Sequence, residues 1–490
     1  MHNHGSVQEH LVVNERLNAG EFGQAIGLSA KLLEDNPDNV DVWVLLGRSL
    51  IGAGEIQEAI TVLTRATFID RKSALAWSYL GHAQRLAGKT SQASTSLSES
   101  VSLAPSDPDI LTRLGLFQSY TGDYKSAVDT LRYVCLISPN QQSAKVNLGN
   151  ALRLSGDVSG AIAIYESALL CDPNLSGCHW NRAMAILLSG DYKLGFQAIE
   201  ARHQRVGART PSWILDSWSG TPVHGALLVE SEQGFGDLLQ FARFFMSAAK
   251  RCDSLIVRCH PKMAGIMSLV DGVTSTVSNR EEPPEHSARI QIFSLPKALG
   301  ISEPNPETIP YIGKGLPPKE RWLPPKLDGE IRVGIAWQGN PSYERDHLRS
   351  VELQKLKSLF SIEGVNFYSL QKYDGAEQLD QICPSIRPVD LGARLDNTGQ
   401  AFLGSAEAMR ELDLVISTDT STVHLAGALG VPCWVMLPFA PDWRWGLNSE
   451  VTPWYPEMRL FRQRRAKDWS SVVDRVRVAL ESFQVRTIGE

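Results

Sequence analysis

The sequence of 490 residues predicts two fold classes in succession: an α superhelix of helical hairpins, then an α/β region of two Rossmann-like lobes. Three observations carry this prediction. Glycine recurs every 34 residues up to Gly190, apolar strand-like runs then alternate with helical segments, and a proline-rich stretch divides these segments into two groups. A period of 34 residues is typical of stacked helical hairpins, and strand–helix alternation is typical of a parallel sheet covered by helices.

The hairpin array depends on a ladder of glycines at one position of each repeat. These glycines are Gly20, Gly54, Gly88, Gly122, Gly156 and Gly190. Glycine suits the turn after a helix because it adopts a left-handed backbone conformation without a Cβ clash. A second glycine precedes four of them by seven residues, at Gly47, Gly81, Gly115 and Gly149. We expect it where the two helices of one hairpin approach closely.

The first helix of a repeat also carries a pattern of its own, Trp43-x-x-Leu46-Gly47, which returns at residues 77–81. With this pattern and the glycine ladder, residues 6–205 resemble the tetratricopeptide repeat family, in about six repeats. Stacked hairpins of this kind form a concave groove that binds a partner. The resemblance therefore implies protein–protein interaction, and leaves the partner open.

Two asparagines are candidates for that groove. Asn147 and Asn181 lie 34 residues apart, on the first helices of their repeats. A carboxamide donates and accepts hydrogen bonds, so such a pair suits the backbone of an extended acceptor peptide. The alternative is that both are solvated polar positions.

Composition argues against several classes of partner and compartment. A net charge of −6 without a basic stripe gives no basis for nucleic-acid binding. No apolar run approaches the ~20 residues of a membrane span, and the N-terminus lacks the plan of a secretory signal. The seven cysteines are scattered without CxxC pairs, as in a reducing compartment. We therefore expect a soluble, cytoplasmic protein with no cofactor and no metal.

The repeat pattern ends near residue 205, and strand–helix alternation follows. Strands are expected at 226–230, 255–259, 331–337, 365–370, 414–417 and 433–437. Helices are expected at 238–249, 353–360, 404–411 and 423–429. The proline-rich stretch at 304–325 is interpreted as a linker between one lobe at 220–315 and a second at 328–490. Two such lobes place a ligand at the carboxyl ends of their strands.

The loop after the strand at 414–417 is a candidate phosphate site. Hydroxyls gather where the following helix begins, and the candidates are Asp419, Thr420, Ser421, Thr422 and His424. A helix N-terminus offers free N–H groups and partial positive charge, which suit a diphosphate. An ordinary helix cap explains one hydroxyl but not several in a row.

The first lobe carries a matching loop at Gly234-Phe235-Gly236-Asp237. Two glycines allow the backbone to approach a ligand closely, so Gly234 and Gly236 are candidate donor-binding residues. Asp237 stands where the helix begins, and a carboxylate there is a candidate general base for an acceptor hydroxyl. A plain helix cap is the alternative interpretation of Asp237.

Three segments together resemble the two-lobed GT-B glycosyltransferases, in particular the heptosyltransferase-like family 9. They are Glu232-Gln233-Gly234-Phe235-Gly236-Asp237, Asp419-Thr420-Ser421-x-x-His424-Leu425 and Pro441-Asp442-Trp443-Arg444-Trp445. The likeness spans residues 226 to about 480. It implies that Asp237 is the catalytic base, and that the loop beginning at Asp419 holds the diphosphate of a nucleotide sugar.

The resemblance also implies a cation that assists the leaving phosphate. The family has a lysine in the loop after the first strand of the second lobe, and the comparable residue here is Arg349. Arginine still neutralises phosphate, with a planar fork in place of a point charge. Gln338, Asn340 and Gln371 end strands on the same side, where they are candidates either for binding the ribose or base or for stabilising loops.

Repeats joined to such lobes resemble the layout of protein O-glycosyltransferases. The expected function is therefore an inverting, metal-independent glycosyltransferase. It would move a sugar from a nucleotide sugar to a Ser or Thr hydroxyl of a bacterial surface or flagellar protein docked on the repeats. Two alternatives stay open: a glycosyltransferase acting on a saccharide of the lipopolysaccharide type, and a non-catalytic repeat scaffold.

Overall fold

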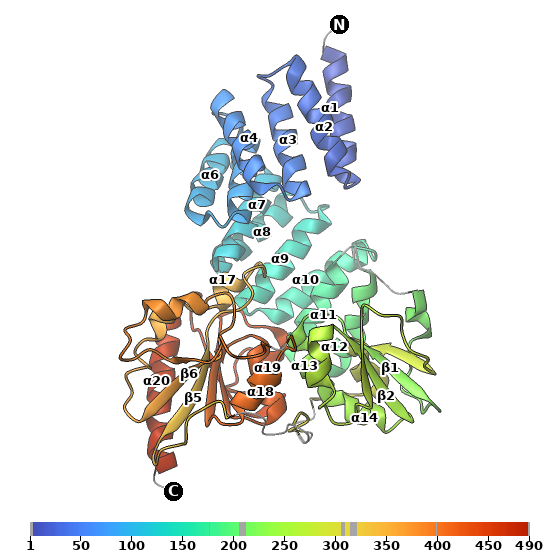
Figure 1. The fold of residues 1–490 in the computed structure, drawn as a ribbon. Coiled ribbons are helices and arrows are strands. Elements are labelled where there is room, and N and C mark those ends of the chain that lie inside the picture. Colours follow the sequence, from blue (N-terminus) through green and yellow to red (C-terminus); the bar gives the residue numbers. More distant parts are fainter. Residues whose placement is uncertain are drawn as a thin grey trace. The chain divides into compact units, whose positions relative to one another are not determined.

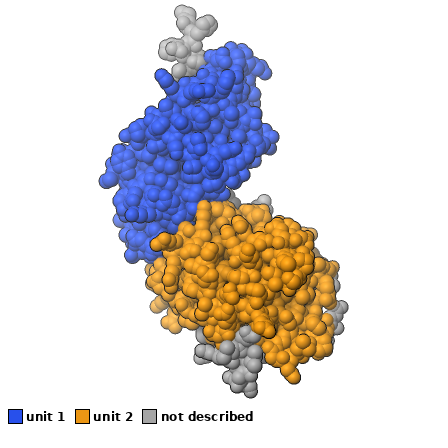
Figure 2. Space-filling view, turned by 90° about the vertical axis from the view of Figure 1, so that its left-hand side faces the viewer, with its two compact units in different colours: residues 1–173 blue, residues 174–490 orange. Residues whose placement is uncertain are grey.

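The computed structural model describes residues 3–175, 177–204, 212–304, 309–313, 321–397 and 399–488. The chain forms two compact units, residues 1–173 and 174–490 (Figure 2). In its described part the first unit contains helices alone, whereas the second combines helices with two sheets (Figure 1).

The first unit is a stack of helical hairpins, as the sequence predicts. Its helices are α1 (Asn3–Asn18), α2 (Phe22–Asp35), α3 (Val40–Ala53), α4 (Ile56–Ile69), α5 (Ala74–Leu86), α6 (Thr90–Leu103), α7 (Pro108–Thr121), α8 (Tyr124–Ile137), α9 (Gln142–Ser155) and α10 (Val158–Cys171). Consecutive helices pack against one another, and so do the successive first helices α1, α3, α5, α7 and α9. Every ladder glycine has a positive φ, from 71° at Gly88 to 94° at Gly156. The predicted left-handed turns are therefore confirmed.

The second set of glycines lies where the two helices of a hairpin touch. A Cβ added to Gly47 would stand 2.5 Å from a methyl carbon of Leu63, and one on Gly81 would stand 2.7 Å from Cγ of Leu97. Leu63 and Leu97 are themselves buried. The close helix approach predicted for these glycines is confirmed, because no larger residue fits without displacing a core leucine.

Replacing Gly149 by Ala is expected to destabilise the repeats by about 1–3 kcal/mol, the usual effect of overpacking a core. The new methyl group would stand 2.5 Å from the ring of Tyr165, which is fully buried and bonded through its hydroxyl to Asn150. Gly27→Ala on α2 is the matched control, because nothing lies within 4 Å of its added Cβ. It should stabilise by about 0.5–1 kcal/mol. Urea unfolding followed by circular dichroism compares the two, and equal midpoints would contradict the packing argument.

The second unit begins with a further hairpin, α11 (Cys178–Ser189) and α12 (Tyr192–Ala198), followed by the 3₁₀ helices η1 (Ile199–Gln204) and η2 (Ser212–Asp216). This hairpin packs on the α/β part: the ring of Tyr192 meets the edge of Trp454, and Phe196 meets both Phe241 and Trp454. The domain boundaries expected from the sequence, at 6–205, 220–315 and 328–490, stay predictions.

The first sheet has four parallel strands in the order β3-β2-β1-β4. The strands are β1 (Ala226–Glu230), β2 (Ser254–Cys259), β3 (Ser275–Ser278) and β4 (Ala288–Gln291). Around them lie α13 (Phe235–Phe241), η3 (Ala242–Phe244), α14 (Phe245–Ala249), η4 (Pro261–Met263), α15 (Ala264–Met267), η5 (Ile292–Ser294) and α16 (Leu295–Leu299). The strands predicted at 226–230 and 255–259 are confirmed. The segment predicted as one helix at 238–249 is interrupted by the 3₁₀ turn η3.

The second sheet has seven strands in the order β10-β11-β9-β8-β5-β6-β7, and all neighbours are parallel except β10 and β11. The strands are β5 (Ile331–Ala336), β6 (Val365–Ser369), β7 (Val389–Asp390), β8 (Leu414–Thr418), β9 (Cys433–Leu437), β10 (Val451–Thr452) and β11 (Tyr455–Arg462). The accompanying helices are α17 (Asp346–Arg349), η7 (Leu353–Leu356), η8 (Ala376–Gln381), α18 (Leu403–Met409), α19 (Ser421–Leu429), η9 (Trp443–Trp445) and α20 (Trp469–Ile488). Strands β5, β8 and β9 are buried at every residue, as in a parallel sheet covered on both faces.

One predicted helix is wrong. Residues 353–360 form only the 3₁₀ helix η7 and a series of turns. Leu353, Leu356 and Leu359 are all buried at a spacing of three residues, which is the period of a 3₁₀ helix. The expected linker at 304–325 falls partly outside the described residues. Along the helices that the structure describes, none combines the length and apolar character needed to cross a membrane.

Candidate functional site

The two candidate loops lie at the carboxyl ends of parallel strands, one in each sheet. Residues 231–234 connect β1 to α13, and Asp419 and Thr420 connect β8 to α19. The two helices pack side by side (Figure 1), and a Cβ on Gly236 would stand only 3.1 Å from the ring of His424. The structure thus brings together the two loops that the sequence singled out. It also shows that Gly236 allows this close helix contact.

Asp237 is held at the start of α13 by two kinds of contact. Its Oδ2 accepts a hydrogen bond of 2.8 Å from the backbone N–H of Gly234, which is a helix-capping contact. Its Oδ1 pairs with the guanidinium of Arg444. Burial raises the pKa of Asp237, and the positive charge of Arg444 opposes that rise. Asp237 is therefore both a helix cap and the partner of a buried positive charge. Its carboxylate oxygens have further lone pairs that can accept hydrogen bonds.

Arg444 is the residue that joins the second sheet's loop to Asp237. It is buried, and it also donates to the side chain of Gln240 and, at 2.7 Å, to Asp442. Burial lowers the pKa of Arg444, because it disfavours the charged form. The negative charges of Asp442 and Asp237 outweigh burial and raise the pKa of Arg444 above its usual range. No role beyond its place in the motif at 441–445 was expected for Arg444, so this contact was missed.

The N-terminus of α19 has no side-chain cap. Thr420 is its N-cap residue, but the Thr420 hydroxyl lies 3.4 Å from the hydroxyl of Ser417 and makes no capping bond to the helix. Ser421 and Thr422, both half-buried, complete the first turn. The helix therefore presents N–H groups that Thr420 does not satisfy, which is the arrangement that binds anions.

Arg349 reaches the same helix end from the loop after β5. It donates to the backbone carbonyl of Asp419 at 3.1 Å and to the carboxylate of Asp346 at 2.9 Å. Burial and the negative charge of Asp442 raise the pKa of Asp419 to about 6, while Arg349 lowers it. A cation, a helix N-terminus and a carboxylate with a raised pKa thus share one site.

His424 is a buried neutral group in this site. Its Nδ1 lies 3.0 Å from the hydroxyl of Tyr455, and its ring stacks on Trp445 at 5.5 Å. Burial, together with Arg444 and Arg243, lowers the pKa of His424 well below its usual value. His424 is therefore neutral and adds no positive charge at this end of α19.

The side chains of Gln371 and Gln338 form hydrogen bonds that stabilise the neighbouring loops. Gln371 accepts from the backbone N–H groups of Trp337 and Gln338 and donates to the carbonyls of Gln338 and Asp374, so its hydrogen-bonding capacity is fully used. The side-chain oxygen of Gln338 accepts from Gln378 at 2.8 Å. Of the two roles left open by the sequence, these contacts favour loop stabilisation over ribose binding.

Three other predicted residues have simpler surroundings. Asn340 is exposed, and its side chain accepts from the backbone N–H of Ser342 at 2.9 Å. Asn147 on α9 and Asn181 on α11 are each half-buried on the first helix of a hairpin. A role for any of the three in ligand binding stays a prediction.

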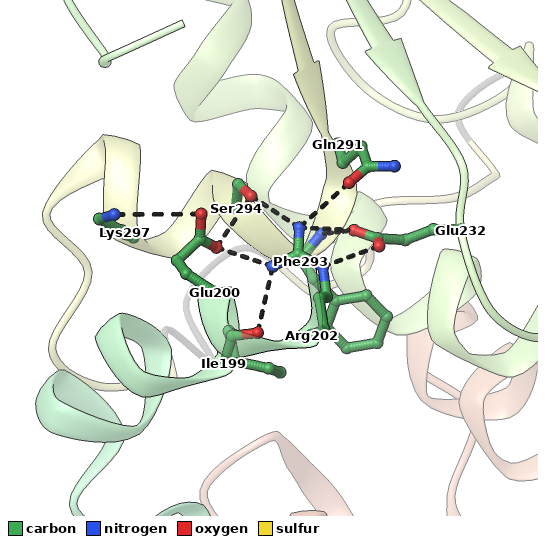
Figure 3. Close-up of polar contacts among 8 residues, drawn as sticks. All are labelled: Ile199, Glu200, Arg202, Glu232, Gln291, Phe293, Ser294 and Lys297. Atoms are coloured by element: carbon green, nitrogen blue, oxygen red, sulfur yellow. Dashed lines mark hydrogen bonds and ion pairs between the residues drawn. The ribbon is translucent and has the colours of Figure 1, made fainter. Parts of the chain in front are cut away.

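A second polar cluster fixes the start of the loop that leads to Asp237 (Figure 3). Arg202 of η1 donates to both carboxylate oxygens of Glu232, at 2.8 and 3.0 Å, and to the hydroxyl of Ser294 at 2.7 Å. Glu232 also accepts from the backbone N–H of Phe293, and the Glu200 carboxylate pairs with Arg202. Burial raises the pKa of Glu232 and Arg202 opposes it. The sequence marked Glu232 as part of a motif but carried no signal for Arg202.

Within the described residues, no three His, Cys, Asp or Glu side chains are grouped as a metal site. The predicted metal independence therefore stays a prediction, and so do the roles assigned to the residues above.

Residues 16–83 match the tetratricopeptide repeat family. The helical hairpins are therefore tetratricopeptide repeats, and such repeats are protein-interaction scaffolds. Protein FlbA of Caulobacter vibrioides is 25% identical over 320 residues, which cover 59% of this chain and 52% of FlbA.

Solved structures match the repeats at low similarity. A chain of the APC/C hetero-tetramer Cut9–Hcn1 is 22% identical, with a TM-score of 0.37, over 41% of this chain and 39% of its own length. A thermophilic repeat protein of Thermus thermophilus is 18% identical, with a TM-score of 0.34, over 37% of this chain and 98% of its own. The chain thus spans about half the length of FlbA and less of the Cut9–Hcn1 chain.

Proposed function

We propose that the second unit is a glycosyltransferase of the two-lobed GT-B type, similar to family 9, with Rossmann-like lobes built on the two sheets. It moves a sugar from a nucleotide sugar to an acceptor hydroxyl. The observation that carries this proposal is the close approach of Gly236, the residue before Asp237, to Ser421 at the uncapped N-terminus of α19, which Arg349 also reaches. A carboxylate base and an anion site at the carboxyl ends of parallel strands are what such a transfer needs.

The transfer proceeds in one displacement. The acceptor oxygen attacks the anomeric carbon, its proton passes to Asp237, and the bond from that carbon to the diphosphate breaks. Attack from the face opposite the leaving group inverts the configuration. The nucleoside diphosphate departs with the bonding electron pair, and the N–H groups of α19 with Arg349 stabilise its charge.

Arg444 and burial set the base strength of Asp237 in opposite directions. Burial raises its pKa, which makes the carboxylate a stronger base, while Arg444 keeps it ionised and oriented. A carboxylate that is ionised but has a raised pKa suits proton abstraction near neutral pH.

The acceptor is proposed to be a Ser or Thr side chain of a polypeptide that the repeats bind. The support is the presence of a protein-interaction scaffold in the same chain as the transfer site. The sugar, the nucleotide and the identity of the acceptor are set by contacts that these residues alone do not define.

Arg349→Met is expected to weaken the binding of the cognate nucleoside diphosphate about 10- to 100-fold, because a hydrogen bond to a charged group contributes about 1.5–3 kcal/mol. Isothermal titration with ADP, GDP, UDP and CDP first identifies the ligand and then compares the variants. Arg477→Met on α20 is the matched control, since among the described residues that arginine forms its ion pair with the exposed Glu481. Equal affinity of the two variants would remove Arg349 from the donor site.

A further inference from the structure

A short loop, residues 231–234, leads from β1 to α13 and Asp237. We propose that Arg202 and Gln233 are positioning residues that hold Asp237 in place through this loop. Arg202 belongs to η1, which follows directly on the hairpin α11–α12, so the end of the repeat region contributes to the transfer site. Their role rests on the proposed function, because it takes Asp237 as the base of the transfer.

The first half of the loop is anchored to the sheet and to Arg202. The backbone N–H of Ser231 donates to the carbonyl of Arg258 on β2 at 2.9 Å. The carboxylate of Glu232 accepts from Arg202 at 2.8 and 3.0 Å and from the backbone N–H of Phe293 at 3.0 Å (Figure 3). A bidentate arginine–carboxylate pair fixes the direction of the carboxylate as well as its distance. Glu232 therefore holds one orientation in the loop.

The second half of the loop transmits this orientation to Asp237. Gln233 is exposed and has a φ of 62°. Residues other than glycine seldom adopt a positive φ, and they keep it only where their surroundings enforce it. Here Glu232 is fixed on one side, and on the other the backbone N–H of Gly234 donates to Asp237 at 2.8 Å. The left-handed turn at Gln233 thus aims this N–H at the carboxylate.

The hydrogen bond from Gly234 controls both the place and the charge of the base. A Cβ added to Gly234 would stand only 3.1 Å from Oδ2 of Asp237, so the contact is close. Burial raises the pKa of Asp237, whereas the charge of Arg444 and the N–H of Gly234 lower it. Loss of this hydrogen bond would therefore misplace the carboxylate and raise its pKa further.

The test compares two substitutions at Gln233 in the full-length chain. Valine strongly disfavours a positive φ, so Gln233→Val should turn the N–H of Gly234 away from Asp237. We expect the rate of transfer of labelled sugar from UDP-, GDP-, ADP- or CDP-sugars to lysate protein to fall about 10- to 100-fold, as when a reacting group is misplaced by about 1 Å. Gln233→Gly is the conservative variant. Glycine adopts the same φ freely, so it should keep most of the rate.

Lys467→Val is the matched control for the backbone change. Lys467 is also exposed and has a φ of 67°, but it lies between β11 and α20. The same substitution there should leave the transfer rate as in the parent. Titration with ADP, GDP, UDP and CDP should give unchanged affinities in all three variants, because the anion site at α19 is not altered.

Arg202→Lys tests the link to the end of the repeat region. Lysine keeps the charge but lacks the planar fork that binds both oxygens of Glu232. We expect a smaller loss of rate than in Gln233→Val. The double variant Arg202→Lys/Gln233→Val should lose little more than Gln233→Val alone, because both changes act through one loop. A full rate in Arg202→Lys would remove Arg202 from the positioning residues.

The pKa of Asp237 is a second readout, which needs neither donor nor acceptor. Carbon-13 NMR of a chain labelled at its aspartate carboxyls measures it, and Asp237→Asn assigns the signal by its absence. Gln233→Val should raise this pKa. It should also shift the acid limb of the pH–rate profile to higher pH, since the base must be ionised to act. Lys467→Val should change neither quantity.

These outcomes separate the positioning role from the proposed function. Absence of transfer in the parent chain would contradict the proposed function, and the pKa comparison would still decide whether the loop controls Asp237. An unchanged pKa of Asp237 in Gln233→Val, or an equal change in Lys467→Val, would overturn the positioning role. So would a transfer rate in Gln233→Val that equals the rate of the active parent.

Discussion

Replacing Asp237 by Asn is expected to lower kcat/KM for sugar transfer about 10²- to 10⁴-fold, the usual contribution of a positioned general base. Asparagine keeps the shape of the side chain but cannot take the proton of the acceptor hydroxyl. The rate of nucleoside diphosphate release in the presence of acceptor measures the effect.

Asp442→Asn is the matched control for that experiment. Both carboxylates pair with Arg444, so each substitution removes one negative charge next to the same guanidinium. Only Asp237 is placed at the start of α13 as the proposed base. Comparable losses in the two variants would assign the effect to Arg444 and not to proton transfer.

Arg202→Met is expected to destabilise the second unit by about 3–5 kcal/mol, the cost of leaving one member of a buried ion pair without its partner. The Arg202 side chain is 4% exposed and that of Glu232 is 12% exposed, and the two share a bidentate contact. Urea unfolding measures the change. Arg477→Met, which breaks an exposed pair with Glu481, should cost less than about 1 kcal/mol.

The double variant Arg202→Met/Glu232→Gln separates a charge effect from a packing effect. Removing both charges should recover much of the stability lost in Arg202→Met, because the most buried carboxylate, that of Glu232, is then gone, and Glu200 keeps Lys297 as a partner. A loss in the double variant as large as in the single one would show that packing dominates.

The pair of Arg202 and Glu232 also affects the design of deletion experiments. Removing residues 1–205 takes away Arg202 of the second unit together with the repeats. The contribution of the repeats is therefore better tested by substitutions in the full chain.

The repeats could be predicted from the sequence because their signals are local. The glycine ladder reports left-handed turns, and Gly47 and its equivalents report helix contact within one hairpin. Strands β5, β8 and β9 were equally easy to predict from the sequence, because a strand buried on both faces requires a continuous apolar run. The 3₁₀ helix η7 was missed because a buried leucine every third residue also fits an α-helix at that length.

The site was only partly predictable. The loops with Asp237 and Thr420 stand out in the sequence because glycines and hydroxyls cluster at helix starts. Arg444 and Arg202 act through partners 207 and 30 residues away, and no spacing in the sequence reports such contacts. Gln371 follows a strand, as a ligand-binding residue would, and its four hydrogen bonds favour the alternative role of stabilising the loop.

Transfer of labelled sugar to protein is a direct test of the proposed glycosyltransferase. The full chain is incubated with a bacterial lysate and each of a set of radiolabelled nucleotide sugars, and the products are separated into protein and saccharide. We expect label on protein with one donor, released only by proteolysis or deglycosylation, and loss of this label with Asp237→Asn. Label on saccharide alone, label that Asp237→Asn transfers equally well, or no transfer from any donor would contradict it.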